Sequence, residues 1–106
     1  MYTRIVEITL KPGKLNEARD MMNREVAPVL RTQTGFVDSI ALVSDTDQNT
    51  IVSITMWHTK AEAERYNNAQ FPRLIEMIEP MMTRYNVKTF TVESSTFHKI
   101  AAGKAA

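Results

Sequence analysis

The chain has 106 residues, with 13 lysines and arginines, 12 aspartates and glutamates, and no cysteine. The balance of charge gives no electrostatic reason to expect binding to nucleic acid or to an anionic membrane. The lack of cysteine excludes disulfides, thiol catalysis and cysteine-ligated metals, so packing must hold the fold. No stretch reaches the roughly 18 apolar residues of a membrane span. Because the N-terminus also lacks a signal-peptide pattern, we expect a cytoplasmic protein.

The first half of the chain predicts a strand, a helix and a second strand. Residues 2–10 alternate with a period of two, which predicts a strand, and Pro12-Gly13 forms the turn after it. Apolar residues then repeat at helical spacing from Leu15 to Val29. Pro28 should kink this helix or end it early. Residues 36–43 form the second predicted strand.

The second half likewise predicts a strand, a helix and a strand. Residues 50–57 predict a third strand, joined to the second by a polar hairpin connection. Thr59-x-x-Glu62 is a capping box that opens a long helix. Pro72 should kink or restart that helix, because proline suits a first helical turn. Alternation returns in residues 86–98, which we expect to form the fourth strand.

The order strand–helix–strand–strand–helix–strand is that of the ferredoxin-like α+β fold. We therefore expect one domain over residues 1–98 and a flexible tail over residues 99–106. In this fold both helices cover one face of the sheet. The second and third strands nevertheless carry apolar residues on both faces, with Phe36, Ile40 and Leu42 opposite Val37, Ala41 and Val43, and Ile51 and Trp57 opposite Val52, Ile54 and Met56. Each apolar face of a sheet must be covered. The helices cover one face, and the sheet of a second copy would cover the other, so the sequence predicts a homodimer.

Glu7 lies in the middle of a strand that this topology makes central. A buried carboxylate is costly unless it is paired. We expect Glu7 to be buried and paired with a basic residue such as Lys88 or Arg4, within the chain or across the dimer. The alternative is that Glu7 serves as an acid or base in a pocket.

A pocket is predicted where the third strand meets the second helix. Trp57, the only tryptophan, ends the strand beside the helix cap, and His58 follows it. Trp57 is either a pocket wall or simply a core residue, and a tryptophan can be both. Tyr66 lies on a helix face that looks back toward Trp57. We expect Phe71 and Met77 to complete an apolar pocket for a planar aromatic molecule.

Three further sets of polar residues give weaker indications of a functional site. Asn67 is unusual in a helix interior, which indicates either a weakened helix or a polar contact to a ligand. Asp45, Asp47 and Asn49 copy the start of a calcium loop, but the required glycine and glutamate are missing, so a hairpin turn is expected. His58 and His98 lack a carboxylate at ligand spacing. We therefore expect no metal site.

Several short motifs accompany the order of the elements: Pro12-Gly13, Pro28, Thr34-Gly35-Phe36 and Trp57-His58-Thr59-Lys60-Ala61-Glu62-Ala63. With these motifs the chain resembles the antibiotic biosynthesis monooxygenase family over about residues 2–98. The resemblance implies a dimeric α+β barrel. It also implies one of several activities, which include cofactor-free oxidation of polycyclic phenols and quinols, and haem degradation.

The catalytic residues of the family are only partly present. In members that oxidise phenols, the family tryptophan would match Trp57, but Ser53 stands where an asparagine is expected and Ala63 where a tyrosine is expected. In haem-degrading members, a tryptophan would stand at Tyr66, an asparagine near Val6 or Glu7, and the haem-ligating histidine near Glu76. These departures argue against haem, so we expect no cofactor.

The sequence and the resemblance together predict a monooxygenase-like enzyme that acts on an aromatic phenol or quinol. In such chemistry the deprotonated substrate supplies the electrons to O₂. Tyr66 or His58 would assist proton transfer, and Trp57 would stack on the ring. The alternative is a non-catalytic protein, stress-related or otherwise, that binds a small molecule in the same pocket.

Overall fold

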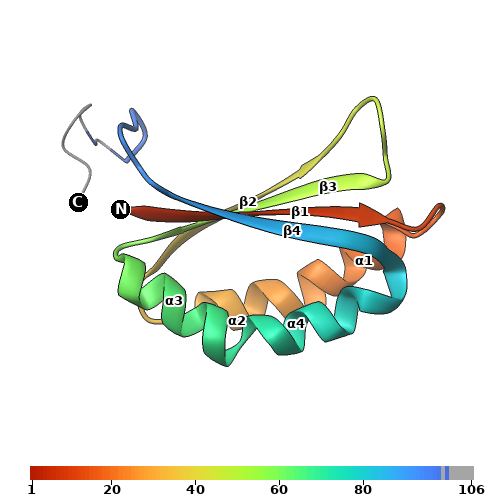
Figure 1. The fold of residues 1–106 in the computed structure, drawn as a ribbon, viewed down its shortest axis with the longest axis horizontal. Helices are drawn as coiled ribbons and strands as arrows, with labels where there is room; N and C mark the ends of the chain where they lie inside the picture. Colours follow the sequence, from red (N-terminus) through yellow and green to blue (C-terminus); the bar gives the residue numbers. More distant parts are fainter. Residues whose placement is uncertain (99, 101–106) are drawn as a thin grey trace.

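The computed structural model describes residues 1–98 and 100, and it confirms the predicted ferredoxin-like α+β fold. These residues form one antiparallel sheet in the order β2-β3-β1-β4, with the helices along one face (Figure 1). The elements in chain order are β1 (Tyr2–Leu10), α1 (Leu15–Met21), the π-helical turn η1 (Met22–Val26), α2 (Ala27–Arg31), β2 (Phe36–Val43), β3 (Thr50–Trp57), α3 (Lys60–Ala69), α4 (Phe71–Ile78), the 3-10 turn η2 (Glu79–Met81) and β4 (Met82–Thr91).

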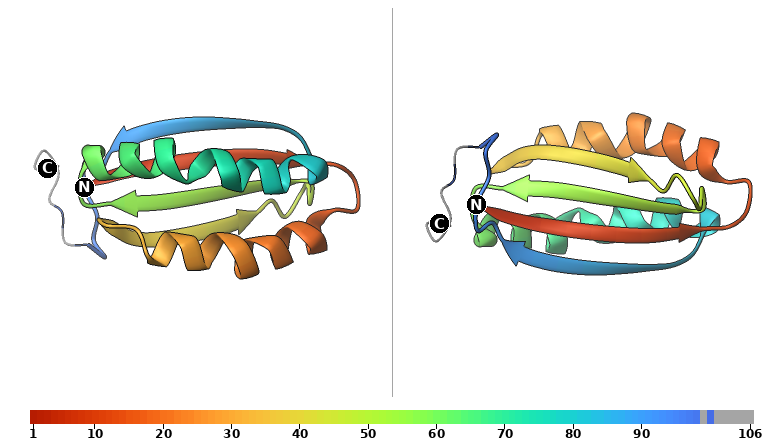
Figure 2. Two further views of the ribbon diagram at one scale, coloured as in Figure 1. Left: turned by 90° about the horizontal axis from the view of Figure 1, so that it is seen from below. Right: turned by 90° about the horizontal axis from the view of Figure 1, so that it is seen from above.

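The central strand β1 separates a covered face from an open one. Arg4, Val6, Ile8 and Leu10 are buried beneath the helices, as the alternation predicts. Figure 2 shows the two rows of helices side by side on this face and the bare sheet on the other. Glu7 lies on the open face, where its side chain is exposed. It forms no ion pair within residues 1–98 and 100, so its predicted burial and pairing within the chain are wrong. Pairing across a dimer, or a role as an acid or base in the small pocket that Glu7 lines, stays a prediction.

A β-bulge corrects the predicted faces of β2. The register shifts between Phe36 and Asp38, because the bulge places one extra residue in this strand. Phe36 therefore pairs with Trp57 on the covered face, while Ile40 and Leu42 lie on the open face. The sequence had placed Phe36 with Ile40 and Leu42, since strict alternation takes no account of a bulge.

The first helix continues through Pro28 by widening. Proline has no N–H, and its ring would clash with the carbonyl of Arg24 four residues earlier in a regular α-helix. The chain forms the π turn η1 over Met22–Val26 just before this point, and α2 then runs to Arg31. A π turn spaces the backbone more widely, which accommodates the proline. The helix is thus neither ended early nor confined to the predicted residues 15–29.

The second helical segment starts and restarts as predicted. The Thr59 hydroxyl accepts a hydrogen bond from the backbone N–H of Glu62 at 3.2 Å and donates one to the Glu62 carboxylate at 2.9 Å. The helix breaks at Gln70, and α4 begins with Pro72 in its first turn. Two helical pieces in place of one continuous helix bring Tyr66 and Phe71 to the same cavity wall.

The fourth strand differs from the prediction in both of its ends. β4 spans Met82–Thr91, whereas alternation predicted residues 86–98. The strand matches its partner in extent: Leu10 pairs with Met82, and Tyr2, the first residue of β1, pairs with Thr91. The residues after Thr91 alternate but have no strand beside them. Of the predicted flexible tail, residue 99 and residues 101–106 lie outside the described residues.

The open face of the sheet is apolar and uncovered in the single chain. Ile40, Leu42 and Phe90 are 43%, 47% and 47% exposed, and Ile5 and Ile54 between them are half-buried. No helix among the described residues has the length and apolar character needed to cross a membrane. The covered face holds the core, which consists of one cluster around Ile8 and Leu10 and another around Trp57 and Tyr66.

Candidate functional site

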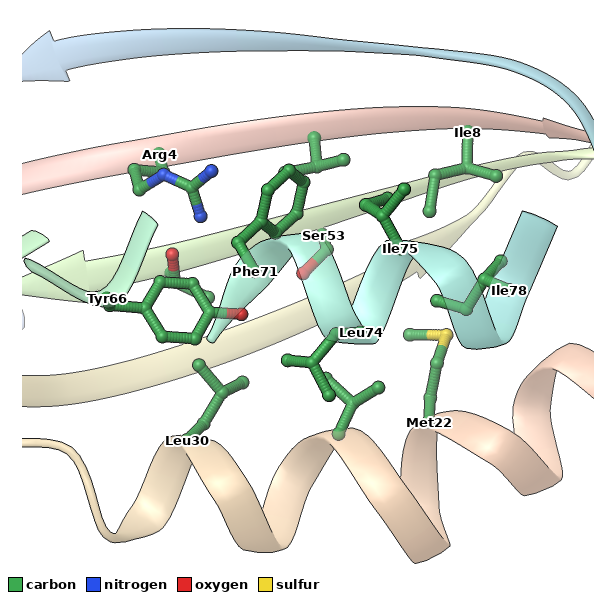
Figure 3. A pocket seen from close by; sticks show the side chains of 13 residues that line it. Arg4, Ile8, Met22, Leu30, Ser53, Tyr66, Phe71, Leu74, Ile75 and Ile78 are labelled. Atoms are coloured by element: carbon green, nitrogen blue, oxygen red, sulfur yellow. The ribbon is translucent and has the colours of Figure 1, made fainter. Parts of the chain in front are cut away.

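The covered face of the sheet and the helices enclose an apolar cavity of about 40 Å³ (Figure 3). Its polar atoms come from Arg4, Ser53, Thr55 and Tyr66. In Figure 3, Arg4 reaches down from the sheet toward Tyr66 and Phe71, while Met22 and Leu30 rise from the first helix. The remaining walls are apolar and consist of Val6, Ile8, Met22, Val26, Leu30, Phe71, Leu74, Ile75 and Ile78.

Tyr66 is the buried hydroxyl-bearing ring of this cavity. It lies on the face of α3 that turns toward the sheet, and it is 4% exposed. Its ring centre lies 4.9 Å from that of Trp57 and 6.3 Å from that of Phe71. Burial raises the pKa of Tyr66, and the positive charge of Arg4 partly opposes that rise. At neutral pH the phenol is therefore protonated, so it can donate a hydrogen bond but is a poor base.

Arg4 places a positive charge beside this ring. It lies on the central strand and is only 2% exposed. Its guanidinium carbon is 5.2 Å from the centre of the Tyr66 ring and 4.4 Å from that of Phe71, and Nη2 donates to Asn67 Oδ1 at 2.9 Å. Within residues 1–98 and 100, no carboxylate forms an ion pair with Arg4. Burial lowers the pKa of Arg4 and Tyr66 raises it, but an arginine stays charged under these conditions.

An unpaired buried arginine is rare, because removing a charge from water is costly. The sequence pattern suggested Arg4 only as a partner for Glu7, so its place in the site was missed. A signal was nevertheless present. Arg4 shares its strand face with Val6, Ile8 and Leu10, and this alternation places a cation among apolar, core-facing side chains.

Among the other predicted pocket residues, some line the cavity and others lie behind its walls. Phe71 lines the cavity with Tyr66, as expected. Asn67 does not line the cavity. Its side-chain oxygen accepts a hydrogen bond from the Arg4 guanidinium, so Asn67 positions a cavity residue. Met77 is half-buried against the core cluster around Trp57 and does not line the cavity.

Trp57 is a core residue and not a cavity wall. It is 0% exposed, and its indole N–H donates to Thr55 Oγ1 at 3.0 Å. Phe36 meets it edge to face at 5.6 Å on one side, and Tyr66 packs on the other. In this structure Trp57 therefore presents no surface to the cavity on which a ligand ring could stack. Tyr66 stands between Trp57 and the cavity.

His58 lies on the surface, and its backbone N–H donates to the Gly35 carbonyl at 2.9 Å. Its side chain does not line the cavity, so the expected role in proton transfer has no geometric basis. Asp47 accepts hydrogen bonds from the Asn49 N–H and the Thr50 hydroxyl, and this hairpin explains the calcium-like pattern. In the described part of the chain, no three His, Asp or Glu side chains gather as a metal site would need.

A cleft of about 300 Å³ lies next to the cavity, between the first helical segment and β2. The two spaces share Met22, Val26, Leu30 and Ser53, so these side chains form the partition between them. A cavity of about 150 Å³ is needed to hold benzene, so an aromatic ligand must widen the smaller space. Met22 is the most adaptable part of the partition, because an unbranched methionine changes rotamer easily.

Solved structures with this fold come from several bacteria. The cofactor-independent oxygenase SnoaB from Streptomyces nogalater is 21% identical, with a TM-score of 0.77 over 90% of this chain and 95% of that one. An antibiotic biosynthesis monooxygenase is 19% identical, with a TM-score of 0.73 over 87% and 98% of the two chains. The protein PA3566 from Pseudomonas aeruginosa is 23% identical, with a TM-score of 0.68 over 84% and 90%. At these identities the likeness establishes the fold.

The comparison of the sequence with family models identifies the family of this chain. No curated protein sequence matches the chain significantly. The family model for antibiotic biosynthesis monooxygenase matches residues 1–71, which run from β1 to the first residue of α4 and include Arg4, Tyr66 and Phe71. The chain therefore belongs to the antibiotic biosynthesis monooxygenase family.

Proposed function

We propose that this protein is a cofactor-independent, monooxygenase-type enzyme that oxidises an aromatic phenol or quinol in the cavity beneath Arg4. The observation that carries the proposal is the pairing of a buried guanidinium with a buried, protonated tyrosine on the wall of an apolar space. Family membership and the fold shared with SnoaB, a cofactor-independent oxygenase, support the same class of reaction.

The substrate must become an anion before it can reduce O₂. A positive charge in a low-dielectric site lowers the pKa of a nearby phenol, so Arg4 favours the phenolate without a dedicated base. Tyr66 then donates a hydrogen bond to the phenolate oxygen, which stabilises the charge where it develops. The apolar walls exclude water from the reacting ring.

The electrons in this reaction balance without a cofactor. One phenol and one O₂ give one quinone and one water. One oxygen atom becomes the new carbonyl, and the other leaves as water with two hydrogens from the substrate. The substrate loses four electrons and O₂ gains four. The protein needs only to bind the ring, favour its anion and shield it, and Arg4, Tyr66 and Phe71 fit these tasks.

We further infer that two copies of the chain pack through their open sheet faces. Ile40, Leu42 and Phe90 are too exposed for a stable lone surface, and an identical apolar face is a matching cover. Such interfaces bury on the order of 2,000 Å² or more. Because the cavity opens on the other side of the sheet, the dimer would leave Arg4 and Tyr66 untouched.

Oxygen uptake tests the proposal directly. Purified protein is mixed with hydroxylated naphthalenes and anthracenes in air-saturated buffer, with no added flavin, haem or metal. We expect O₂ consumption with formation of one quinone per O₂, and no consumption by heat-denatured protein. Tight binding of these compounds without O₂ consumption would instead support a non-catalytic binding protein. The observation that favours this second candidate is Ser53, which lines the cavity where the family resemblance implies an asparagine.

A further inference from the structure

The unpaired charge of Arg4 bears on which molecules the cavity accepts. A guanidinium has five N–H donors in a planar fork, and Asn67 Oδ1 takes one of them. Phe71 and Tyr66 cover the guanidinium with aromatic rings, which stabilise a cation but do not neutralise it. Among residues 1–98 and 100 no acidic side chain pairs with Arg4, so no side chain neutralises its positive charge.

Arg4 also lies where two spaces meet. It lines the apolar cavity, and it lines a groove of about 250 Å³ between α3 and β4. Tyr2 and Thr89 add hydroxyl groups to the groove, and Thr89 is the register partner of Arg4. The acidic side chain of the groove, Glu64, is directed to Lys60 at 3.8 Å instead. An anionic oxygen near Arg4 would therefore meet several donors at the boundary of the two spaces.

We propose that Arg4 is a specificity-determining residue, which selects an aromatic ligand that carries a carboxylate. The carboxylate binds the edge of the guanidinium, and the ring occupies the cavity beside Phe71. A carboxylate matches the planar fork of arginine with two parallel hydrogen bonds. A neutral ligand of the same shape leaves the buried charge unpaired, so the site binds it more weakly. The placement of the ring rests on the proposed function, whereas the charge preference rests on Arg4 alone.

The test compares two ligands of one shape and different charge by titration calorimetry at pH 7. These are 1-hydroxy-2-naphthoate and its uncharged amide, 1-hydroxy-2-naphthamide. We expect the carboxylate to bind about tenfold to a hundredfold more tightly, the range typical of a hydrogen bond to a charged group. The Arg4→Met variant should bind the two ligands equally.

A second variant covers the case in which Arg4→Met fails to fold. Asn67→Asp keeps the guanidinium but places a carboxylate where the amide oxygen now accepts its hydrogen bond. This internal anion should abolish the preference for the charged ligand. Asn68→Asp is the matched control, because Asn68 adds the same charge one residue away and contacts Asn67 but not Arg4. It should keep the preference within about threefold.

Three results would overturn the proposal. The first is equal affinity of the wild-type protein for the acid and the amide. The second is a charge preference that survives Asn67→Asp or a folded Arg4→Met. The third is the absence of binding by either ligand. The test requires no turnover, so it is separate from the proposed reaction: charge selection without O₂ uptake would contradict the enzyme, and O₂ uptake without charge selection would contradict the role of Arg4.

Discussion

The guanidinium carbon of Arg4 lies 4.4 Å from the centre of the Phe71 ring. Arg4 belongs to the central strand, and Phe71 is the first residue of α4, so this contact joins the sheet to the helical layer at the wall of the cavity. Phe71 also meets Tyr85 of β4 edge to face at 6.1 Å. The ring covers a face of the guanidinium and leaves the N–H donors at its edge for a ligand or for Asn67.

Replacing Trp57 should affect the stability of the fold more than ligand binding. Trp57 is fully buried between Phe36 and Tyr66, so Trp57→Ala should lower the free energy of unfolding by about 3–5 kcal/mol. Trp57→Phe should cost less, because much of the packing remains. Urea titrations followed by circular dichroism measure both. A normal unfolding midpoint for Trp57→Ala, with weaker ligand binding, would show that Trp57 is a pocket wall after all.

Removing the hydroxyl of Tyr66 should slow oxidation while leaving binding nearly intact. Tyr66→Phe keeps the ring against Trp57 but removes the donor that would stabilise the phenolate. The rate of O₂ uptake should fall by about 10²–10³, the usual effect of losing one such donor. Tyr85→Phe is the matched control, because that hydroxyl lies on an exposed residue outside the cavity. Equal rates for the two variants would exclude Tyr66 from the chemistry.

Alkaline pH should destabilise the protein partly through Tyr66. Burial raises the pKa of Tyr66 above its ordinary value of 10.0, so the folded state holds its proton more tightly than the unfolded state. The stabilisation this provides is fully present below pH 10 and is lost as the pH rises through the folded pKa. Unfolding midpoints measured from pH 8 to pH 11 should fall less for Tyr66→Phe than for Tyr85→Phe. Parallel curves would show that Tyr66 does not contribute.

Shortening Met22 should ease the entry of ligands. Met22 lies in the partition between the cavity and the cleft, so Met22→Ala should join the two spaces and raise the association rate of aromatic ligands. Met21→Ala is the control, since Met21 packs against the same core cluster without lining either space. Stopped-flow binding gives both rates. If Met21→Ala accelerates association as much as Met22→Ala, general loosening of the helix is the cause.

A charge on the open face of the sheet should separate the two copies. Ile40 is 43% exposed in the single chain, so Ile40→Asp removes little from the core but places a carboxylate in the proposed interface. We expect sedimentation at micromolar concentration to give a dimer for the wild type and a monomer for the variant. Asn68→Asp, an exposed position on α3 in the helical layer away from the open face, should stay dimeric. A wild-type monomer at that concentration would refute the assembly.

The sequence predicted the fold wherever one local rule was sufficient. The predicted bounds of β1, β2 and β3 match the structure to the residue, and the Thr59 capping box located the start of α3. The local rules failed where the pairing between strands determines the structure. β4 ends at Thr91, which pairs with the first residue of β1, although the alternation continues. The bulge before Asp38 likewise depends on contact with β3 and leaves no local signal.

Of the predicted site residues, Tyr66 and Phe71 line the cavity, and Trp57, His58, Met77 and Asn67 do not. Tyr66 and Phe71 meet there because the helix breaks at Gln70 and restarts with Pro72 in its first turn. Spacing does not determine depth, so it could not tell that Tyr66 would stand between Trp57 and the cavity. The position of His58 after the strand did not reveal that its side chain turns to solvent. Arg4 could have been identified from its position, because a charged side chain on the apolar face of a central strand indicates a functional charge.

The π turn before Pro28 also determines which way the side chains of α2 face. Each residue of an α-helix advances the side chains by about 100° around its axis, since 3.6 residues complete a turn. The turn over Met22–Val26 takes up an additional residue, and this resets the rotational phase of α2 relative to α1. A regular α-helix with the same number of residues would therefore turn Leu30 about 100° away from the cavity, even if every side chain were unchanged. At η1, the backbone conformation is therefore as strict a requirement as the residue type.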